Sequence, residues 1–181
     1  SVYGSSGMVV SQEILASTIG ADILSQGGNA IDAAVATGFA LAVTLPRAGN
    51  LAGGGFMLVY LADKEKTIAL DYREMAPSGA TRDMFLDAQG DVDNQRARFS
   101  INSSAVPGTV AGLLHAHKEY GSLSLSKVIN PAIKLAKSGF DVSVDLSTSL
   151  QSRASRLSKN KASQGYFYKK NGDFYQPGEK F

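Results

Sequence analysis

The chain has 181 residues, of which 44% are hydrophobic and 19% are charged, and its formal net charge is +2 at pH 7. This composition supports a sizeable core and argues against disorder, and the near-neutral charge gives no case for a nucleic-acid partner or for binding to an anionic membrane. The absence of cysteine excludes a disulfide framework and a thiolate zinc site, and no apolar run reaches the ~20 residues that span a bilayer.

The first part of the chain predicts a short strand followed by two helices. An apolar run at 8–10 is typical of a strand. Ser11 is a good N-cap, and apolar residues that recur every four positions predict a helix over 11–26, which ends at a Gly-Gly pair. Asn29 is expected to cap a second helix, over 30–45, with apolar residues on several faces.

A glycine run at 53–55 leads into the most distinctive pair of predicted strands. The first strand, over 56–62, is apolar at nearly every position, which predicts burial on both faces. The return strand, over 67–72, alternates between apolar and polar residues. We therefore expect a hairpin in the middle of the molecule, with Arg73 emerging at its edge.

The remainder of the chain predicts mostly helices. A helical turn is expected at 80–86, and the polar stretch 87–104 indicates a surface loop. Three further helices are expected, over 110–119, 124–137 and 142–157. Asn171-Gly172 between two aromatic runs predicts a second hairpin.

The glycine run has three interpretations. A phosphate-binding P-loop has Lys and then Ser or Thr after its last glycine, whereas Phe56 and Met57 stand here. A dinucleotide fingerprint has a strand before its glycines and a helix after them, and the predicted order here is the reverse. A tight entry into a buried strand is therefore the better interpretation.

The two histidines, His115 and His117, do not indicate a catalytic or metal site. At positions i and i+2 of a predicted helix they point to different sides and cannot hold one ion together. No metal site is therefore expected, and a serine hydrolase of the Ser-His type has no obvious base in this chain.

Arg73 is the most promising binding residue. Its guanidinium fork suits bidentate recognition of a carboxylate. The alternative is a structural ion pair with Asp71 or Glu74, and spacing alone favours that alternative by roughly two to one.

Four motifs occur in order along the chain and together resemble one family. They are GGNAIDAAVA at 27–36, GNLAGGGFM at 49–57, LDYREMAP at 70–77 and VPGTVAG at 106–112. The sequence is similar, from about residue 8 to its end, to the N-terminal part of the large subunit of a bacterial-type γ-glutamyltranspeptidase. We treat 1–181 as a single-domain fragment of that subunit with no internal boundary.

The resemblance implies an α+β fold and a mechanism. Members of this family are N-terminal-nucleophile hydrolases with a four-layer αββα sandwich and mainly antiparallel central sheets. Their precursor cleaves itself into two subunits, and the threonine exposed at the start of the small subunit is the nucleophile, with its own α-amino group as the base. The γ-glutamyl group of glutathione or a related compound passes to water, an amino acid or a peptide, without a cofactor or a metal.

Carried onto this chain, the resemblance places no catalytic residue here and reverses the assessment of Arg73. The chain has no Thr-Thr-His run, so it is expected to be inactive alone and to need the small subunit of the same precursor. Arg73 matches the family arginine that binds the substrate α-carboxylate. The resemblance also implies a bacterial periplasmic or secreted protein.

Two departures and two alternatives accompany the resemblance. Ala52 stands where relatives have the first of four glycines, and Leu45 stands where many have histidine. The alternative to an enzyme is a non-catalytic module derived from the family, which would bind a carboxylate or serve as a scaffold. Cephalosporin acylases and poly-γ-glutamate depolymerases share the family, and the residues that separate them lie mostly in the small subunit.

Overall fold

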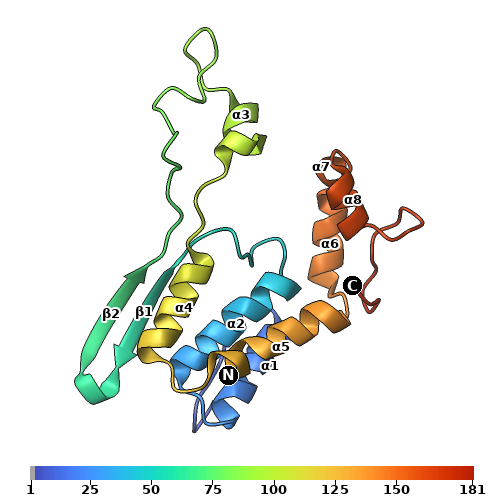
Figure 1. Ribbon diagram of the computed structural model, residues 1–181. Helices are drawn as coiled ribbons and strands as arrows, with labels where there is room; N and C mark the ends of the chain where they lie inside the picture. Colours follow the sequence, from blue (N-terminus) through green and yellow to red (C-terminus); the bar gives the residue numbers. More distant parts are fainter. Residues whose placement is uncertain (1–2) are drawn as a thin grey trace. The chain divides into compact units, whose positions relative to one another are not determined.

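The structure, a computed structural model, describes residues 3–181 (Figure 1). The chain folds into two compact units, which are described separately. The first unit comprises Ser1–Asn50 and Gly121–Phe181, and the second comprises Leu51–Tyr120. None of the helices in the described part of the chain is both long enough and apolar enough to cross a membrane.

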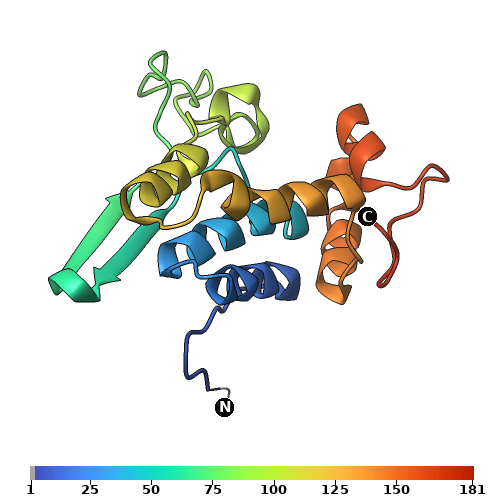
Figure 2. The same ribbon diagram turned by 60° about the horizontal axis from the view of Figure 1, so that its bottom comes forward.

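The first unit is helical. Its helices are α1 (Ile14–Ser25), α2 (Ala30–Thr44), α5 (Leu125–Ser138), α6 (Val144–Ser152), α7 (Ala154–Leu157) and α8 (Lys161–Phe167). Helix α2 lies between α1 and α5 (Figure 2). Because it contacts a helix on each side, α2 buries Val35, Ala36 and Ala40 completely, which agrees with its apolar residues on several faces.

The start of α2 is confirmed and that of α1 is corrected. The Asn29 side chain accepts hydrogen bonds from the backbone N–H groups of Ile31 and Asp32, and the Asp32 side chain accepts one from Asn29, which completes a capping box. Ser11, however, is not the cap of α1. Its hydroxyl donates to the Glu13 carbonyl, and the Glu13 carboxylate caps the helix instead. The strand expected at 8–10 is also wrong, because these residues are in no strand.

The C-terminal helices differ from the single helix expected over 142–157. Arg153 interrupts that helix and separates α6 from α7. Helix α8 was not expected, and it includes Tyr166 and Phe167, the first two residues of the first aromatic run of the expected hairpin. What remains of the hairpin is the bridge between Tyr168 and Phe174, around Gly172 with φ of 88°. Helix α5, in contrast, continues through Pro131.

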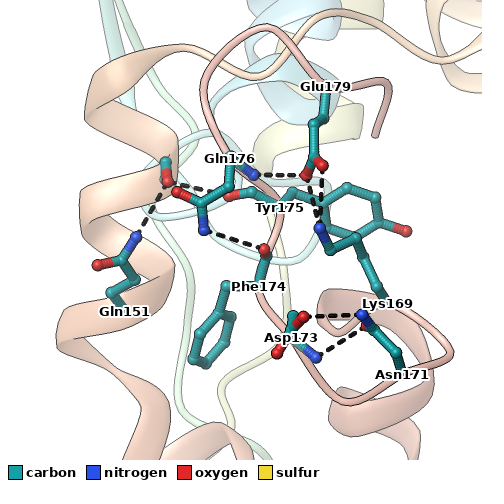
Figure 3. Close-up of polar contacts among 9 residues, drawn as sticks. Gln151, Lys169, Asn171, Asp173, Phe174, Tyr175, Gln176 and Glu179 are labelled. Carbon is teal, nitrogen blue, oxygen red and sulfur yellow. Dashed lines mark hydrogen bonds and ion pairs between the residues drawn. The ribbon is translucent and has the colours of Figure 1, made fainter.

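The chain after α8 is held by polar contacts (Figure 3). The Lys169 ammonium lies 2.9 Å from both carboxylate oxygens of Glu179, and the Gln176 N–H donates to the same carboxylate at 2.7 Å. These two contacts, that of Gln176 first, hold the pKa of Glu179 below its ordinary value. Phe181 stacks on Phe140 and Tyr175 with ring centroids 5.5 and 5.0 Å apart, so this segment packs onto the core.

The second unit contains a hairpin packed on one helix. Strands β1 (Phe56–Leu61) and β2 (Lys66–Asp71) pair antiparallel from Phe56 with Asp71 to Leu61 with Lys66, through the turn η1 (Ala62–Lys64). Helix α4 (Thr109–Tyr120) contacts β2, and Val59 on β1 is only 6% exposed. The hairpin and its limits, to within one residue, are therefore as the sequence predicts.

The expected burial of the hairpin on both faces is wrong for this chain. Phe56, Leu58 and Tyr60 point away from the buried face and are 66%, 78% and 65% exposed. Their apolar character, which led to the expectation, therefore belongs to a face that no residue within 3–181 covers.

The stretch between the hairpin and α4 also differs from the expectation. Residues 82–85 form turns, and no helix is found at 80–86. The expected loop at 87–104 contains α3 (Asn94–Phe99) and η2 (Ile101–Ser103). The Asp93 side chain caps α3 by accepting from Gln95 and Arg96, a local signal that the polar composition concealed.

Candidate functional site

Arg73 lies in the second unit, between two paired stretches of backbone. Beyond β2 the pairing continues, because Tyr72 N–H donates to the Gly55 carbonyl at 3.0 Å. After Arg73 and Glu74, Met75 and Val106 form a bridge in which each N–H donates to the other residue's carbonyl, at 3.1 and 2.8 Å. The backbone of Arg73 is therefore fixed from both sides.

The glycine run packs directly against this backbone. A Cβ on Gly54 would lie 2.7 Å from the α-carbon of Arg73 and would also overlap the Glu74 nitrogen. The carbonyl of Gly53 accepts hydrogen bonds from Gly108 and Thr109 at 2.7 and 3.0 Å, at the start of α4. The glycines thus allow the strand and the helix start to approach Arg73 closely.

Ala52, the departure from the glycine pattern, fits this loop without strain. Within residues 3–181, Glu65 is the only residue other than glycine that has a positive φ, so the φ of Ala52 is negative. Ala52 therefore has the backbone conformation that any residue adopts.

Tyr72 attaches the end of β2 to α4. A Cβ on Gly112 of α4 would overlap the Tyr72 ring, so the helix and the ring are in close contact. The Tyr72 hydroxyl donates to the Phe56 carbonyl at 3.4 Å, and burial raises the pKa of this hydroxyl. Tyr72 therefore points inward, whereas its neighbour Arg73 is exposed.

The Arg73 guanidinium has no local ion pair. Among the described residues it forms no hydrogen bond or ion pair with Asp71 or Glu74. Asp71 instead accepts the backbone N–H of Arg73 at 3.0 Å. The alternative that spacing favoured, a structural ion pair, is therefore not found within residues 3–181.

Arg73 lines a hollow of about 270 Å³ in the second unit. Glu74, Asn102, Ser103 and Ser104 also line the hollow. Ser103 donates to the Ser100 carbonyl, whereas Asn102 and Ser104 form no side-chain hydrogen bond with other described residues. The hollow thus presents one cation, one anion and free hydrogen-bonding groups.

The sequence did not indicate Glu74, Asn102 and Ser104 as site residues. Glu74 was considered only as a partner of Arg73, and the other two fell in the stretch expected to be a surface loop. They reach the hollow because the bridge between Met75 and Val106 brings together segments about 30 residues apart. No local sequence pattern predicts that pairing.

The histidines lie outside this hollow. His115 is exposed on α4 and His117 is half-buried on the same helix. The part of the chain that the structure describes contains no group of three or more His, Cys, Asp or Glu residues placed to hold a metal ion.

Gly54 provides a direct test of the close packing beside Arg73. We expect Gly54→Ala to lower the free energy of unfolding by about 1–3 kcal/mol, because the added methyl group meets backbone atoms that cannot move aside. Gly79→Ala is the matched control, since a Cβ there meets nothing within 4 Å. Urea unfolding of both variants measures the difference, and equal stabilities would contradict the packing argument.

The chain is similar in sequence to a known protein family and similar in structure to a solved member of that family. The family model described as Gamma-glutamyltranspeptidase matches residues 16–181. A glutathione hydrolase proenzyme of Escherichia coli (strain K12) is 47% identical over 98% of this chain, and one of Pseudomonas sp. (strain A14) is 43% identical over 99%. The crystal structure of Helicobacter pylori gamma-glutamyltranspeptidase covers 99% of this chain with a TM-score of 0.95 and 46% identity.

These matches cover only part of each relative. The chain spans 30% of the E. coli protein, 31% of the Pseudomonas protein and 51% of the H. pylori chain. The expected fold class, an α+β portion of the N-terminal-nucleophile hydrolase sandwich, is confirmed by the structural match and by the helices and small antiparallel sheet of the chain.

Proposed function

The chain belongs to the γ-glutamyltranspeptidase family, and from that premise we propose that it is the N-terminal part of the large subunit of a γ-glutamyl transferase or hydrolase. The complete enzyme cleaves the γ-glutamyl amide of glutathione and related compounds. It transfers the acyl group to water, an amino acid or a peptide. Its nucleophile is an N-terminal threonine in the small subunit of the same precursor, activated by its own amino group.

In this proposal Arg73 binds the α-carboxylate of the γ-glutamyl group. The single observation that carries the assignment is that Arg73 lines a hollow and that its guanidinium has no ion pair with its acidic neighbours among the described residues. A guanidinium presents two parallel N–H donors that match the two oxygens of a carboxylate. Glu74 in the same hollow adds the opposite charge, which suits a substrate end that carries both a carboxylate and an ammonium group.

The fixed backbone around Arg73 supports this role. A binding residue positions its ligand well only when its own backbone is held in place. The close approach of Gly54 and the bridge between Met75 and Val106 supply that support on either side of Arg73.

The proposed partner subunit has a surface to cover. Phe56, Leu58 and Tyr60 form an exposed apolar row on β1. Soluble proteins rarely leave such a row facing water. We assign this face to contact with the remainder of the precursor.

Family membership also supports export to the bacterial periplasm or the medium.

Expression of the full-length gene product tests the proposal. Mass spectrometry should find two fragments, the smaller with threonine at its N-terminus, and the protein should release p-nitroaniline from γ-glutamyl-p-nitroanilide. The 181-residue chain alone should release none, because it lacks the nucleophile. A single uncleaved chain without activity would favour a non-catalytic carboxylate-binding or scaffold module.

A further inference from the structure

We propose that Asn171 is a site of spontaneous covalent modification, at which the side-chain amide nitrogen is lost as ammonia. Asn171 is the only asparagine in the sequence that is followed by glycine. The modification begins when the backbone nitrogen of the following residue attacks the side-chain amide carbon of the asparagine. Glycine has no Cβ to obstruct that approach, so the reaction meets less steric hindrance at Asn171 than at any other asparagine of the chain.

The turn that carries Asn171 is exposed and lightly held. Residues 170–173 are all exposed, and Gly172 has a φ of 88°. A Cβ built on Gly172 would meet no atom within 4 Å, so the space around the attacking nitrogen is open. That nitrogen donates its hydrogen to the Lys169 carbonyl at 2.9 Å, and an isolated β-bridge closes the turn. Exposed hydrogen bonds with few buried contacts around them open at low cost, which frees the nitrogen for attack.

The neighbouring Asp173 prepares the Asn171 amide for the attack (Figure 3). The Asp173 backbone N–H donates to Asn171 Oδ1 at 3.1 Å, and the Asp173 carboxylate accepts from Asn171 Nδ2 at 2.7 Å. These two contacts fix the orientation of the amide. Attack on the amide carbon places negative charge on Oδ1, and a backbone N–H aimed at that oxygen stabilises the charge as it develops. The folded turn therefore supplies a donor where the reaction needs one.

The reaction needs no reactant other than water. The Gly172 nitrogen forms a bond to the Asn171 side-chain carbon and gives up its proton. The bond from that carbon to Nδ2 breaks, and the NH₂ group leaves with a proton as ammonia. Water then opens the cyclic imide at either of its carbonyl carbons, which gives aspartate or isoaspartate, the latter with the main chain running through the former side chain. Neither step oxidises or reduces any atom.

Both products disturb the turn. Each replaces the NH₂ donor that faces Asp173 with a carboxylate, and like charges at that distance repel each other. Isoaspartate also lengthens the main chain inside the turn, which opposes the hydrogen bond from Lys169 N–H to the Asp173 carbonyl at 2.8 Å. Modification therefore loosens the segment after α8 and lowers the net charge of +2 by one. None of these residues lines the hollow at Arg73, so the modification is independent of the proposed function.

Incubation of the full-length protein near neutral pH for several weeks, followed by peptide mapping with mass spectrometry, tests the site. Asn160 is the internal control, because it is also exposed but is followed by Lys161, and its side chain accepts the Ser163 N–H at the start of α8. We expect Asn171 to be converted at least about tenfold faster than Asn160. The products differ from the parent peptide by the mass difference between Asp and Asn, and isoaspartate is separated from aspartate by its retention time. Asn171→Gln should show no conversion at this position over the same period, because its ring would be one atom larger.

A synthetic peptide with the sequence of residues 168–176 separates the contribution of the folded turn from that of the Asn-Gly pair. We expect Asn171 in the folded protein to be converted at no less than about one tenth of its rate in the peptide, because the turn is exposed and opens readily. A slower rate in the folded protein would overturn the proposal, since the turn would then protect the amide. Conversion of Asn171 no faster than that of Asn160 would overturn it as well.

Discussion

Arg73→Ala in the full-length protein is expected to weaken the binding of γ-glutamyl substrates by about 1.5–3 kcal/mol, or roughly 10- to 150-fold. The reason is the loss of charge-assisted hydrogen bonds to the α-carboxylate. Because Arg73 has no ion pair with the acidic residues beside it, the substitution leaves no buried charge without its partner. The kinetics of p-nitroaniline release from γ-glutamyl-p-nitroanilide measure the effect.

Arg73→Lys separates charge from geometry. A single ammonium group keeps the charge and cannot replace the two parallel donors of the fork, so this variant should also lose activity. Arg82→Ala is the control, because it removes an exposed arginine of the same unit that does not line the hollow. Unchanged KM and kcat in both Arg73 variants would refute the assignment.

The sequence predicts the parts of this fold that depend on local chemistry. Asn29 and Asp32 form a capping box within four residues, and the hairpin strands are recognisable from their own patterns. The end of α6 at Arg153 could not be predicted in this way, because no residue around Arg153 in the sequence is a helix-stop signal. Helix α3 was missed for another reason, since the polar composition concealed the cap at Asp93.

The burial of side chains was predicted less well than the secondary structure. Leu58 belongs to an apolar face of β1 that is exposed among the described residues. The sequence pattern shows that such a face is apolar, but it does not reveal which segment covers the face. The site shows the same limit. Arg73 was predicted as a binding residue from its residue type and from the family resemblance, and it lines the hollow. Asn102 and Ser104 reach the hollow through a long-range bridge that no local pattern indicates.

Asp32 is a buried carboxylate with a structural role in the first unit. It is fully buried near the start of α2, and it accepts hydrogen bonds from the N–H groups of Asn29, Ser122 and Leu123 and from the Ser122 hydroxyl, the last at 2.6 Å. It therefore joins the first turn of α2 to the residues that lead into α5. The positive end of the α2 dipole favours the ionised carboxylate at this position.

We expect Asp32→Asn to lower the free energy of unfolding by about 3 kcal/mol. The amide has one acceptor oxygen and an NH₂ group that faces donors, and a buried donor left without an acceptor costs about 1–3 kcal/mol. Asp22→Asn is the matched control, because Asp22 lies on α1 and is exposed. Urea unfolding near neutral pH measures both variants, and an equal, small effect in the two would contradict the role of Asp32.

The stabilisation by Asp32 should also depend on pH in a defined direction. Burial alone would raise the pKa of Asp32, but the hydrogen bonds from Ser122, Asn29 and Leu123 outweigh burial and hold the pKa below its ordinary value of 3.8. A carboxyl whose pKa is lower in the folded state contributes stability that is complete above the unfolded pKa and is lost as the pH falls through the folded pKa. The stability difference between wild type and Asp32→Asn should therefore be constant above about pH 5 and shrink below 3.8.

Unfolding measured at a series of pH values from about 6 down to about 2 tests this dependence. Other carboxyl groups protonate over the same interval, but they are present in both proteins, so their contributions largely cancel in the difference. Asp22→Asn, measured over the same pH series, again supplies the reference because Asp22 is exposed on α1. A wild-type advantage over Asp32→Asn that stays constant down to about pH 2 would show that Asp32 stabilises the fold through packing and not through its charge.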